Sequence, residues 1–539
     1  MRNIVFVIVL LVSLASNAQK KTTNTTSLPR PKLVVGIVID QMRWDYLYRY
    51  SDRYSSNGFK RILNEGYTCE NTFIPYTPTV TAAGHTCVYT GSVPAIHGIM
   101  GNNWYRRDLK RSWYCTEDTT FKSVGSTSDA GEMSPSSMLT TTVTDELRMA
   151  TNYRSKVIGI ALKDRGAILP AGHSANGAYW FDNANGAFIT SSYYMKDLPD
   201  WLKQFNSRKL PDQYLQQNWN TLYPINTYVQ STADDKSYEG SLEDNTFPHI
   251  TANITRDKYN AVRITPFGNT LTFEMAKAAV EGERLGQTGN TDFLAVSFSS
   301  PDYIGHTFGP NSIEAEDNYL RLDNELGQFL NYLDGKVGKG QYTVFITADH
   351  AAAHVPEQLR ENKIPAGTLN EVGLLGTLND LIDSRFKIKN AVSSVMNFQV
   401  YLNRSVVGED EQKIKEAIIE RLLENPAIVM AFDLKNTNTV LLPAMIKNMV
   451  TNGYNQKLSG DIQFVFKPQY FSGGRTGTTH GSWNPYDSHI PLLWYGWGIK
   501  KGKTNRETYM TDISATLSAL LHIQMPSGNI GHVIEEVMQ

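Results

Sequence analysis

The sequence predicts an α/β fold in which a mostly parallel sheet is sandwiched between helices, and two observations predict it. First, nearly continuous apolar runs occupy residues 33–39, 157–162, 293–298 and 342–347. Runs of this kind are typical of strands that are buried on both faces. Second, helical stretches separate these runs, and such alternation indicates a parallel sheet that helices cover on both sides.

Further elements are predicted in the second half of the chain. A fifth apolar run at residues 490–495 predicts another strand. The clearest helix is predicted after the third run, where Asn311 and Glu314 have the spacing of a capping box. Its apolar face consists of Tyr319, Leu322, Leu326, Phe329 and Leu333. A last helix is predicted from Leu517, Leu520 and Leu521.

Composition excludes several classes of protein. The chain has 539 residues, of which 41% are hydrophobic, and this excludes a disordered or fibrous protein. Its 51 basic and 53 acidic residues nearly balance, so no overall field attracts nucleic acid or an anionic membrane. Three cysteines, Cys69, Cys87 and Cys115, are too few for a disulfide-stapled scaffold, and the sequence leaves open whether two of them pair.

The N-terminus has the pattern of a Sec signal peptide over residues 1–18. A basic start and an apolar run from Ile4 to Ala15 precede small residues, which predicts cleavage after Ala18. A retained membrane anchor is the alternative, but the run is shorter than the ~20 residues that span a bilayer. Residues 19–32 are polar and threonine-rich and predict a flexible leader. We therefore expect a periplasmic or otherwise extracytoplasmic protein without a membrane span after cleavage.

Two long intervals interrupt the alternation of strands and helices. They cover about residues 166–290 and 355–475, and neither has the composition of a linker. We interpret residues 33–539 as a single catalytic domain in which these two insertions surround the active site.

Ionisable residues follow the first four predicted strands. Asp40 follows the first, Lys163 and Arg165 the second, Asp302 the third, and Asp349 with His350 the fourth. Because ligands of open parallel sheets collect at the carboxyl ends of the strands, these side chains are expected to converge. A single aspartate there is commonly a loop cap, but four charged strand ends favour a functional site.

The residue types favour a metal centre. Asp302 and His306 have i,i+4 spacing, which presents two ligands from one helical turn, and Asp349–His350 pairs an oxygen with a nitrogen ligand. Mixed Asp/His ligation without cysteine suits catalytic zinc, which keeps one position open for substrate. Buried aspartates at 40, 302 and 349 would also repel one another without cations.

A hydroxyl nucleophile is predicted in the segment from Thr77 to Thr86. A threonine at a helix start lies at the positive end of the helix dipole, beside N–H groups that bind anions. A neighbouring metal ion can activate the hydroxyl near neutral pH. Spacing does not choose among Thr77, Thr79 and Thr81, and capping is the commoner role of such residues.

Seven ordered blocks carry a resemblance to a known family. They are Val35 to Tyr46, Pro78-Thr79-Val80-Thr81, Gly101-Asn102, Leu162 to Arg165, Asp302-x-x-x-His306, Ala348-Asp349-His350 and Gly477 to His480. Over essentially the whole mature chain, the sequence resembles the PafA-type bacterial alkaline phosphatases. The resemblance implies a sheet between helices with two Zn²⁺ ions per chain at its carboxyl edge.

The resemblance also implies a role for each matched residue. Thr81 is similar to the family nucleophile. Asp302, His306 and His480 resemble the ligands of one zinc ion, and Asp40, Asp349 and His350 those of the second, which also holds Thr81. Asn102, Lys163 and Arg165 resemble the groups that contact the phosphoryl oxygens. One departure is Ala351, where glycine commonly follows the Asp-His pair.

The implied activity is hydrolysis of phosphate monoesters through a covalent phosphothreonine. Two zinc ions, three aspartates and a threonine alkoxide have formal charges that sum to about zero, so Lys163 and Arg165 match a monoester dianion. A phosphodiesterase or nucleotide pyrophosphatase on the same scaffold is the alternative. No cysteine or serine lies in the Cys/Ser-x-Pro-x-Arg motif of a sulfatase. A non-catalytic phosphate- or metal-capturing protein would not need the nucleophile.

The expected partners are small-molecule phosphate monoesters, with no nucleic acid, and the chain is expected to act as a monomer. Most of the remaining histidines have no predicted role in the chemistry. His354, close to the Asp-His pair, is the best candidate to support a ligand or contact the substrate.

Overall fold

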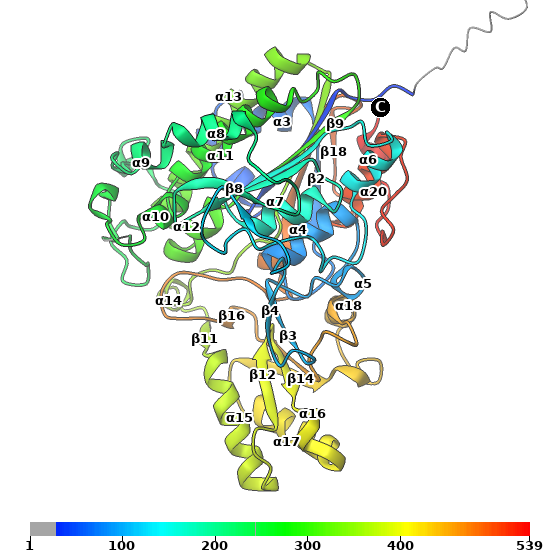
Figure 1. Cartoon of the computed structure of the whole chain (residues 1–539). Coiled ribbons are helices and arrows are strands. Elements are labelled where there is room, and N and C mark those ends of the chain that lie inside the picture. Colours follow the sequence, from blue (N-terminus) through cyan, green and yellow to red (C-terminus); the bar gives the residue numbers. More distant parts are fainter. Residues whose placement is uncertain (1–27, 243) are drawn as a thin grey trace, which may run out of the picture. The chain divides into compact units, whose positions relative to one another are not determined.

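An eleven-stranded sheet forms the centre of the molecule in the computed structural model, which describes residues 28–242 and 244–539 (Figure 1). The strands lie in the order β18-β2-β17-β10-β1-β9-β6-β7-β8-β5, with β19 paired to β2. Their bounds are β1 Leu33–Ile39, β2 Tyr67–Phe73, β5 Ser123–Val124, β6 Val157–Ala161, β7 Gly177–Asp182, β8 Ala187–Ser191, β9 Asp292–Phe298, β10 Tyr342–Thr347, β17 His489–Gly496, β18 Gly502–Thr504 and β19 Thr508–Tyr509. The predicted signal peptide and most of the predicted leader lie outside the described residues.

The predicted parallel core of the sheet is confirmed. β1 pairs in parallel with β9 on one side and with β10 on the other, and β6 pairs in parallel with β9 and β7. Every residue of β1, β6, β9 and β10 is buried, which is why their sequences are continuous apolar runs. The fifth run forms β17, which is antiparallel to both β10 and β2.

Helices cover both faces of this sheet (Figure 1). One layer consists of α4 Thr81–Thr90, α6 Val143–Ala150, α7 Asp164–Ala171 and α20 Asp512–Leu520. The other contains α3 Phe59–Glu65, α8 Asp200–Ser207, α11 Phe267–Glu283 and α13 Ile313–Leu333. The predicted C-terminal helix is α20, and the α/β sandwich is confirmed.

The start of α13 differs from the predicted capping box. Its N-cap is Ser312, whose hydroxyl accepts a hydrogen bond from the Ala315 N–H at 3.1 Å. The side chains of Asn311 and Glu314 bind elsewhere: Asn311 Oδ1 lies 2.8 Å from His354 Nδ1, and Glu314 pairs with His249. The capping prediction was wrong. Asn311 and Ser312 are adjacent polar residues that can both cap a helix, and because Asn311 contacts His354, Ser312 serves as the N-cap.

The two long intervals contain structure of different kinds. Residues 166–290 supply β7 and β8 to the central sheet, together with α11, which packs on β9. Residues 355–475 contain a four-stranded sheet in the order β12-β13-β15-β14, with a separate hydrophobic core. The bounds there are α15 Glu371–Phe386, α17 Glu411–Leu423, α18 Ala444–Gly453, β12 Val392–Met396, β13 Gln399–Leu402, β14 Ile428–Asp433 and β15 Ile462–Phe466. Figure 1 shows this smaller sheet at the bottom of the view.

The remaining α-helices and β-strands of the described chain are short. They are α2 Tyr46–Arg49, α5 Pro94–His97, α9 Leu210–Tyr214, α10 Lys258–Arg263, α12 Ser300–Phe308, α14 Pro356–Glu361, α16 Arg404–Val407, α19 Pro485–Ser488, β3 Asn103–Arg106, β4 Arg111–Tyr114, β11 Gly367–Leu369 and β16 Tyr470–Ser472. Cys69, Cys87 and Cys115 are buried free thiols. No helix among residues 28–242 and 244–539 has the length and apolar character needed to cross a bilayer.

Candidate active site

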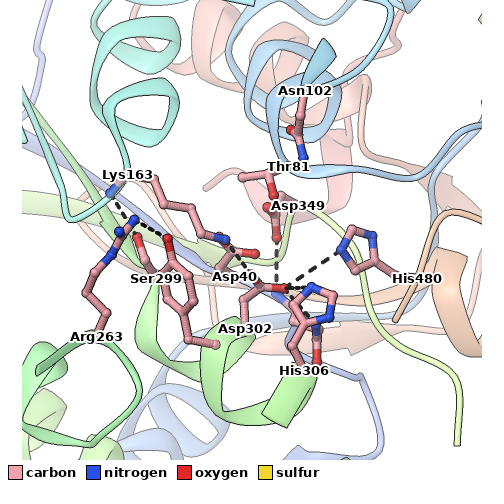
Figure 2. Close-up of polar contacts among 12 residues, drawn as sticks. Asp40, Thr81, Asn102, Lys163, Arg263, Ser299, Asp302, His306, Asp349 and His480 are labelled. Atoms are coloured by element: carbon pink, nitrogen blue, oxygen red, sulfur yellow. Dashed lines mark hydrogen bonds and ion pairs between the residues drawn. The ribbon is translucent and has the colours of Figure 1, made fainter. Parts of the chain in front are cut away.

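Three carboxylates meet at the carboxyl edge of the central sheet (Figure 2). Asp40 follows β1, Asp349 follows β10, and Asp302 lies in the first turn of α12, directly after β9. Because β1 pairs in parallel with both β9 and β10, the three strands end side by side. All three side chains are buried, as the sequence pattern predicts for a site of this kind.

Lys163 links two of these carboxylates. It is the N-cap residue of α7, after β6, and its Nζ lies 2.6 Å from Asp40 Oδ2 and 2.5 Å from Asp302 Oδ2. Burial alone would lower the pKa of Lys163, but Asp302 and Asp40 hold it above its ordinary value, so the ammonium stays charged. One buried cation therefore offsets part of the charge of the three aspartates.

The three carboxylates differ in how their surroundings affect their acidity. Burial, followed by repulsion from Asp302 and Asp349, raises the pKa of Asp40 well above its ordinary value. Asp302 is also buried, but His306 and Lys163 hold its pKa well below its ordinary value. Crowding of the three carboxylates thus disfavours the charged form of Asp40, and a bound cation would favour it.

The main chain orients three imidazole rings toward the carboxylates. Each ring directs Nδ1 at a carbonyl oxygen: His306 at Thr478 (2.8 Å), His350 at Ala351 (3.0 Å) and His480 at Thr79 (2.7 Å). A carbonyl only accepts hydrogen bonds, so Nδ1 carries the proton and Nε2 presents a lone pair. Burial lowers the pKa of His350 and His480, which favours the neutral, metal-binding form.

The Nε2 atoms lie among the carboxylate oxygens. His306 Nε2 is 3.1 Å from Asp302 Oδ1, and His480 Nε2 is 3.8 Å from the same atom. His350 Nε2 lies 3.5 Å from both Asp40 Oδ1 and Asp349 Oδ2. The rings of His350 and His480 stack with their centroids 3.4 Å apart.

These side chains fit metal ions. Two groups have ligand atoms within 4.8 Å of one another: Asp40, Asp349 and His350, and Asp302, His350 and His480. His306 belongs to neither group, although its Nε2 contacts Asp302. Asp40 Oδ1 and Asp349 Oδ2 are buried without a hydrogen-bond partner, which costs free energy unless a cation binds them. Carboxylate and imidazole ligands without thiolate suit zinc.

Thr81 is the first residue of α4 and faces this cluster. Its hydroxyl lies 3.5 Å from His350 Nε2, and its side chain is buried. The hydroxyls of Thr77 and Thr79 instead donate to the main-chain oxygens of Gly481 and Ser482. The geometry therefore favours Thr81 over the other two threonines as the nucleophile.

A glycine sets the distance between α4 and the Asp349 segment. A Cβ at Gly84 would lie 2.3 Å from the main-chain oxygen of Asp349 and 2.7 Å from its Cβ. Only a residue without a side chain permits this close approach, which brings Thr81 beside the ligand cluster.

We expect Gly84→Ala to lower kcat and to destabilise the fold by about 1–3 kcal/mol, because the added methyl pushes α4 away from Asp349. Urea unfolding and steady-state kinetics measure both effects. Gly376→Ala is the matched control, because Gly376 lies inside α15 and a Cβ added there would have no contact within 4 Å. Equal activities of the two variants would contradict the packing argument.

Asn102 contacts the start of α4, and Arg165 lies on α7, which packs against α4. Asn102 Oδ1 accepts a hydrogen bond from the Ala82 N–H at 2.9 Å, which fixes the side chain next to Thr81 (Figure 2). Arg165, in the first turn of α7, donates to the Tyr114 hydroxyl at 3.0 Å, and its buried Nε has no partner. Both residues thus keep N–H groups available for a ligand.

Three residues near the cluster had no predicted role. Gln41 Nε2 donates to Asp302 Oδ1 at 2.6 Å. His85 Nδ1 lies 2.9 Å from the Thr81 carbonyl oxygen and 3.4 Å from Asp349 Oδ2. The Tyr303 ring lies between Lys163 Nζ, at 4.9 Å, and the guanidinium of Arg263, at 4.4 Å. Only their nearness in sequence to predicted site residues pointed to them.

His354 does not reach the ligand cluster through any contact found among the described residues. Its Nε2 lies 3.3 Å from the Arg43 guanidinium and its Nδ1 2.8 Å from Asn311 Oδ1. Burial and the Arg43 charge lower the pKa of His354 to about 3. It therefore ties the loop after Asp349 to the start of α13 as a neutral ring.

A helix-covered sheet with an Asp/His cluster at its carboxyl edge, beside a helix that starts at a threonine, defines an alkaline phosphatase-like metallohydrolase. Residues 34–489 match the family described as type I phosphodiesterase / nucleotide pyrophosphatase. Alkaline phosphatase PhoV of Synechococcus elongatus is 53% identical over 537 residues, 97% of each chain. The crystal structure of alkaline phosphatase PafA is 48% identical, with a TM-score of 0.92 over 95% of this chain and 100% of that chain.

Two further relatives cover nearly the whole chain. Alkaline phosphatase PafA of Elizabethkingia meningoseptica is 49% identical over 541 residues, 98% of each chain. A protein of Myroides odoratus described as a calcium-transporting ATPase is 50% identical over 523 residues, 95% of each chain. This chain belongs to the PafA-type alkaline phosphatases within the type I phosphodiesterase / nucleotide pyrophosphatase family.

Proposed function

We propose that the chain hydrolyses phosphate monoesters through a phosphothreonine at Thr81 and requires two zinc ions. One ion would be held by Asp302, His306 and His480, and the other by Asp40, Asp349, His350 and Thr81. The observation that carries the proposal is the Thr81 hydroxyl, 3.5 Å from a candidate ligand atom of His350 at the start of a helix. Relatives named alkaline phosphatases, about half identical over nearly the whole chain, support it.

The residues of the chain divide the reaction between them. Zinc bound at these ligands would supply Lewis acidity, lowering the pKa of oxygen ligands and neutralising negative charge. Thr81 Oγ attacks phosphorus, the bond to the leaving alcohol breaks, and a water molecule later cleaves the Thr81–phosphorus bond to release phosphate. Asn102, Lys163 and Arg165 hold the non-bridging oxygens, which leaves mainly positioning and electrostatics to the protein.

The start of α4 and the two cations Lys163 and Arg165 favour a doubly charged substrate. The N–H groups at the start of α4 bind anions, and Lys163 and Arg165 add two positive charges. A diester carries only one negative charge and has a second substituent, so these two cations stabilise it less than they stabilise a monoester dianion. The phosphodiesterase alternative therefore has less support, although the matched family includes diesterases by its description.

We expect kcat/KM for an aryl phosphate monoester to exceed that for the matched diester by about 10²-fold or more, because each charge-assisted hydrogen bond contributes about 1.5–3 kcal/mol. The two substrates are compared side by side with zinc added. Lys163→Ala and Arg165→Ala are expected to lower monoester hydrolysis more than diester hydrolysis. The reverse ranking of the two substrates in the wild-type enzyme would replace the monoesterase proposal with a diesterase.

We also propose that the protein acts outside the cytoplasm as a monomer after cleavage of residues 1–18. The apolar N-terminal run supports the cleavage. N-terminal sequencing and light scattering of protein from the periplasmic fraction measure both properties, and a chain that retains Met1 would contradict the cleavage.

A further inference from the structure

Gln41 adopts an unusual backbone conformation directly after Asp40. Its φ of 65° lies in the left-handed region, which glutamine rarely adopts, and its side chain is 4% exposed. A non-glycine residue is held there only when surrounding contacts compensate for the strain. The contacts of Gln41 are therefore expected to stabilise this conformation.

Gln41 donates a hydrogen bond to one carboxylate of each candidate metal site. Its main-chain N–H binds Asp349 Oδ1 at 3.2 Å, and its side-chain Nε2 binds Asp302 Oδ1 at 2.6 Å. These carboxylates come from segments 261 and 308 residues away in sequence. Because Gln41 also follows Asp40, one residue joins the ends of β1, β9 and β10.

A glycine on α12 leaves room for the side-chain amide of Gln41. A Cβ at Gly305, one turn along α12 from Asp302, would lie 2.0 Å from Gln41 Oε1. The glycine therefore leaves the space that the side chain occupies. A carboxylate only accepts hydrogen bonds, so the amide must present its NH₂ group to Asp302.

We propose that Gln41 is a positioning residue that orients Asp302 for metal binding. This inference rests on the two-metal phosphatase proposed above. A hydrogen bond to one carboxylate oxygen fixes the direction of the lone pairs that bind a cation, and loss of such a partner typically weakens metal affinity by about 10- to 100-fold.

The two contacts make the consequence of a substitution asymmetric. Gln41→Ala removes the bond to Asp302 and keeps the main-chain bond to Asp349. The ion held by Asp302 should therefore dissociate more readily, while the ion held by Asp40, Asp349 and His350 should be retained.

The test is zinc content after dialysis of the purified enzyme against a graded chelator. At a chelator concentration at which the wild-type chain keeps both ions, Gln41→Ala is expected to fall from about two zinc ions to about one. Added zinc is expected to restore its turnover, which would not occur if the substitution only disturbed packing. Gln469→Ala is the matched control, since Gln469 is also a glutamine with positive φ (67°).

Gln41→Asn provides a second variant if Gln41→Ala does not fold. Asparagine tolerates positive φ and keeps the amide, but it is one methylene too short for the 2.6 Å contact, so the same loss of one ion is expected. Zinc retention equal to that of the wild type, or simultaneous loss of both ions, in the variant that folds would overturn the inference. A wild-type enzyme without zinc would instead refute the proposed metal centre.

Discussion

We expect Thr81→Ala to abolish the phosphoenzyme and to lower turnover by about 10⁴-fold or more, because the variant lacks the only hydroxyl that the proposal uses as nucleophile. Trapping with a labelled monoester at low pH, followed by intact-protein mass measurement, detects the phosphothreonine. Steady-state assay of the same preparation gives the loss in kcat. Thr81→Ser keeps a hydroxyl at the start of α4 and is expected to retain phosphoenzyme formation.

Thr79→Ala is the matched control for this experiment. The Thr79 hydroxyl donates to the Ser482 main-chain oxygen at 3.1 Å, so its loss affects the loop that carries His480 rather than the attacking group. The variant should still form the phosphoenzyme, with a reduced rate at most. If Thr81→Ala is active and Thr79→Ala forms no phosphoenzyme, the nucleophile is Thr79 and not Thr81.

Removal of metal is expected to eliminate turnover, and zinc is expected to restore it. Without cations, Asp40, Asp302 and Asp349 have only Lys163 and the histidines to offset their charge, and Asp40 Oδ1 and Asp349 Oδ2 stay unpaired. Elemental analysis should find about two zinc ions per active chain. The melting temperature should fall after chelation, because ions that bind only the native state stabilise it.

The control for chelation is the inactive Thr81→Ala variant, which keeps the six Asp and His ligands. It should show the same fall in melting temperature, which separates metal binding from catalysis. A zinc-free enzyme with full activity would defeat the metal proposal.

The central sheet could be predicted because its strands are buried on both faces and therefore have continuous apolar sequences. β1 and β10 have the predicted bounds, and β6 and β9 differ from prediction by one residue. The direction of β17 could not be predicted, because an apolar run has the same composition in either orientation.

The smaller sheet shows why local patterns sometimes fail. β12 and β13 form a hairpin through Asn397 and Phe398, both with positive φ (56° and 62°). Such two-residue turns normally contain Asn-Gly, so phenylalanine at the second position hides the usual signal. The Phe398 side chain packs against the core of the small sheet, and tertiary contacts therefore override the local preference.

The candidate ligands could be predicted from the strand ends, but the residues that form hydrogen bonds near them could not. Asp40, Asp302 and Asp349 follow apolar runs, and their convergence follows from parallel pairing. Gln41 and His85 gain their contacts from segments more than 200 residues away, and no sequence spacing encodes those contacts. The left-handed backbone at Gln41 also has no local signature, because glutamine is not a residue that favours it.

The carbonyl groups that hold His306, His350 and His480 have a consequence for how such an enzyme changes over generations. Main-chain carbonyl groups anchor all three rings. Which ring nitrogen carries the proton therefore does not depend on the side chains at positions 79, 351 and 478. At position 351 the residue is alanine, and its carbonyl oxygen lies 3.0 Å from His350 Nδ1. Genetic drift can thus alter the side chains of these loops without altering which nitrogen of each imidazole is free to bind a metal ion.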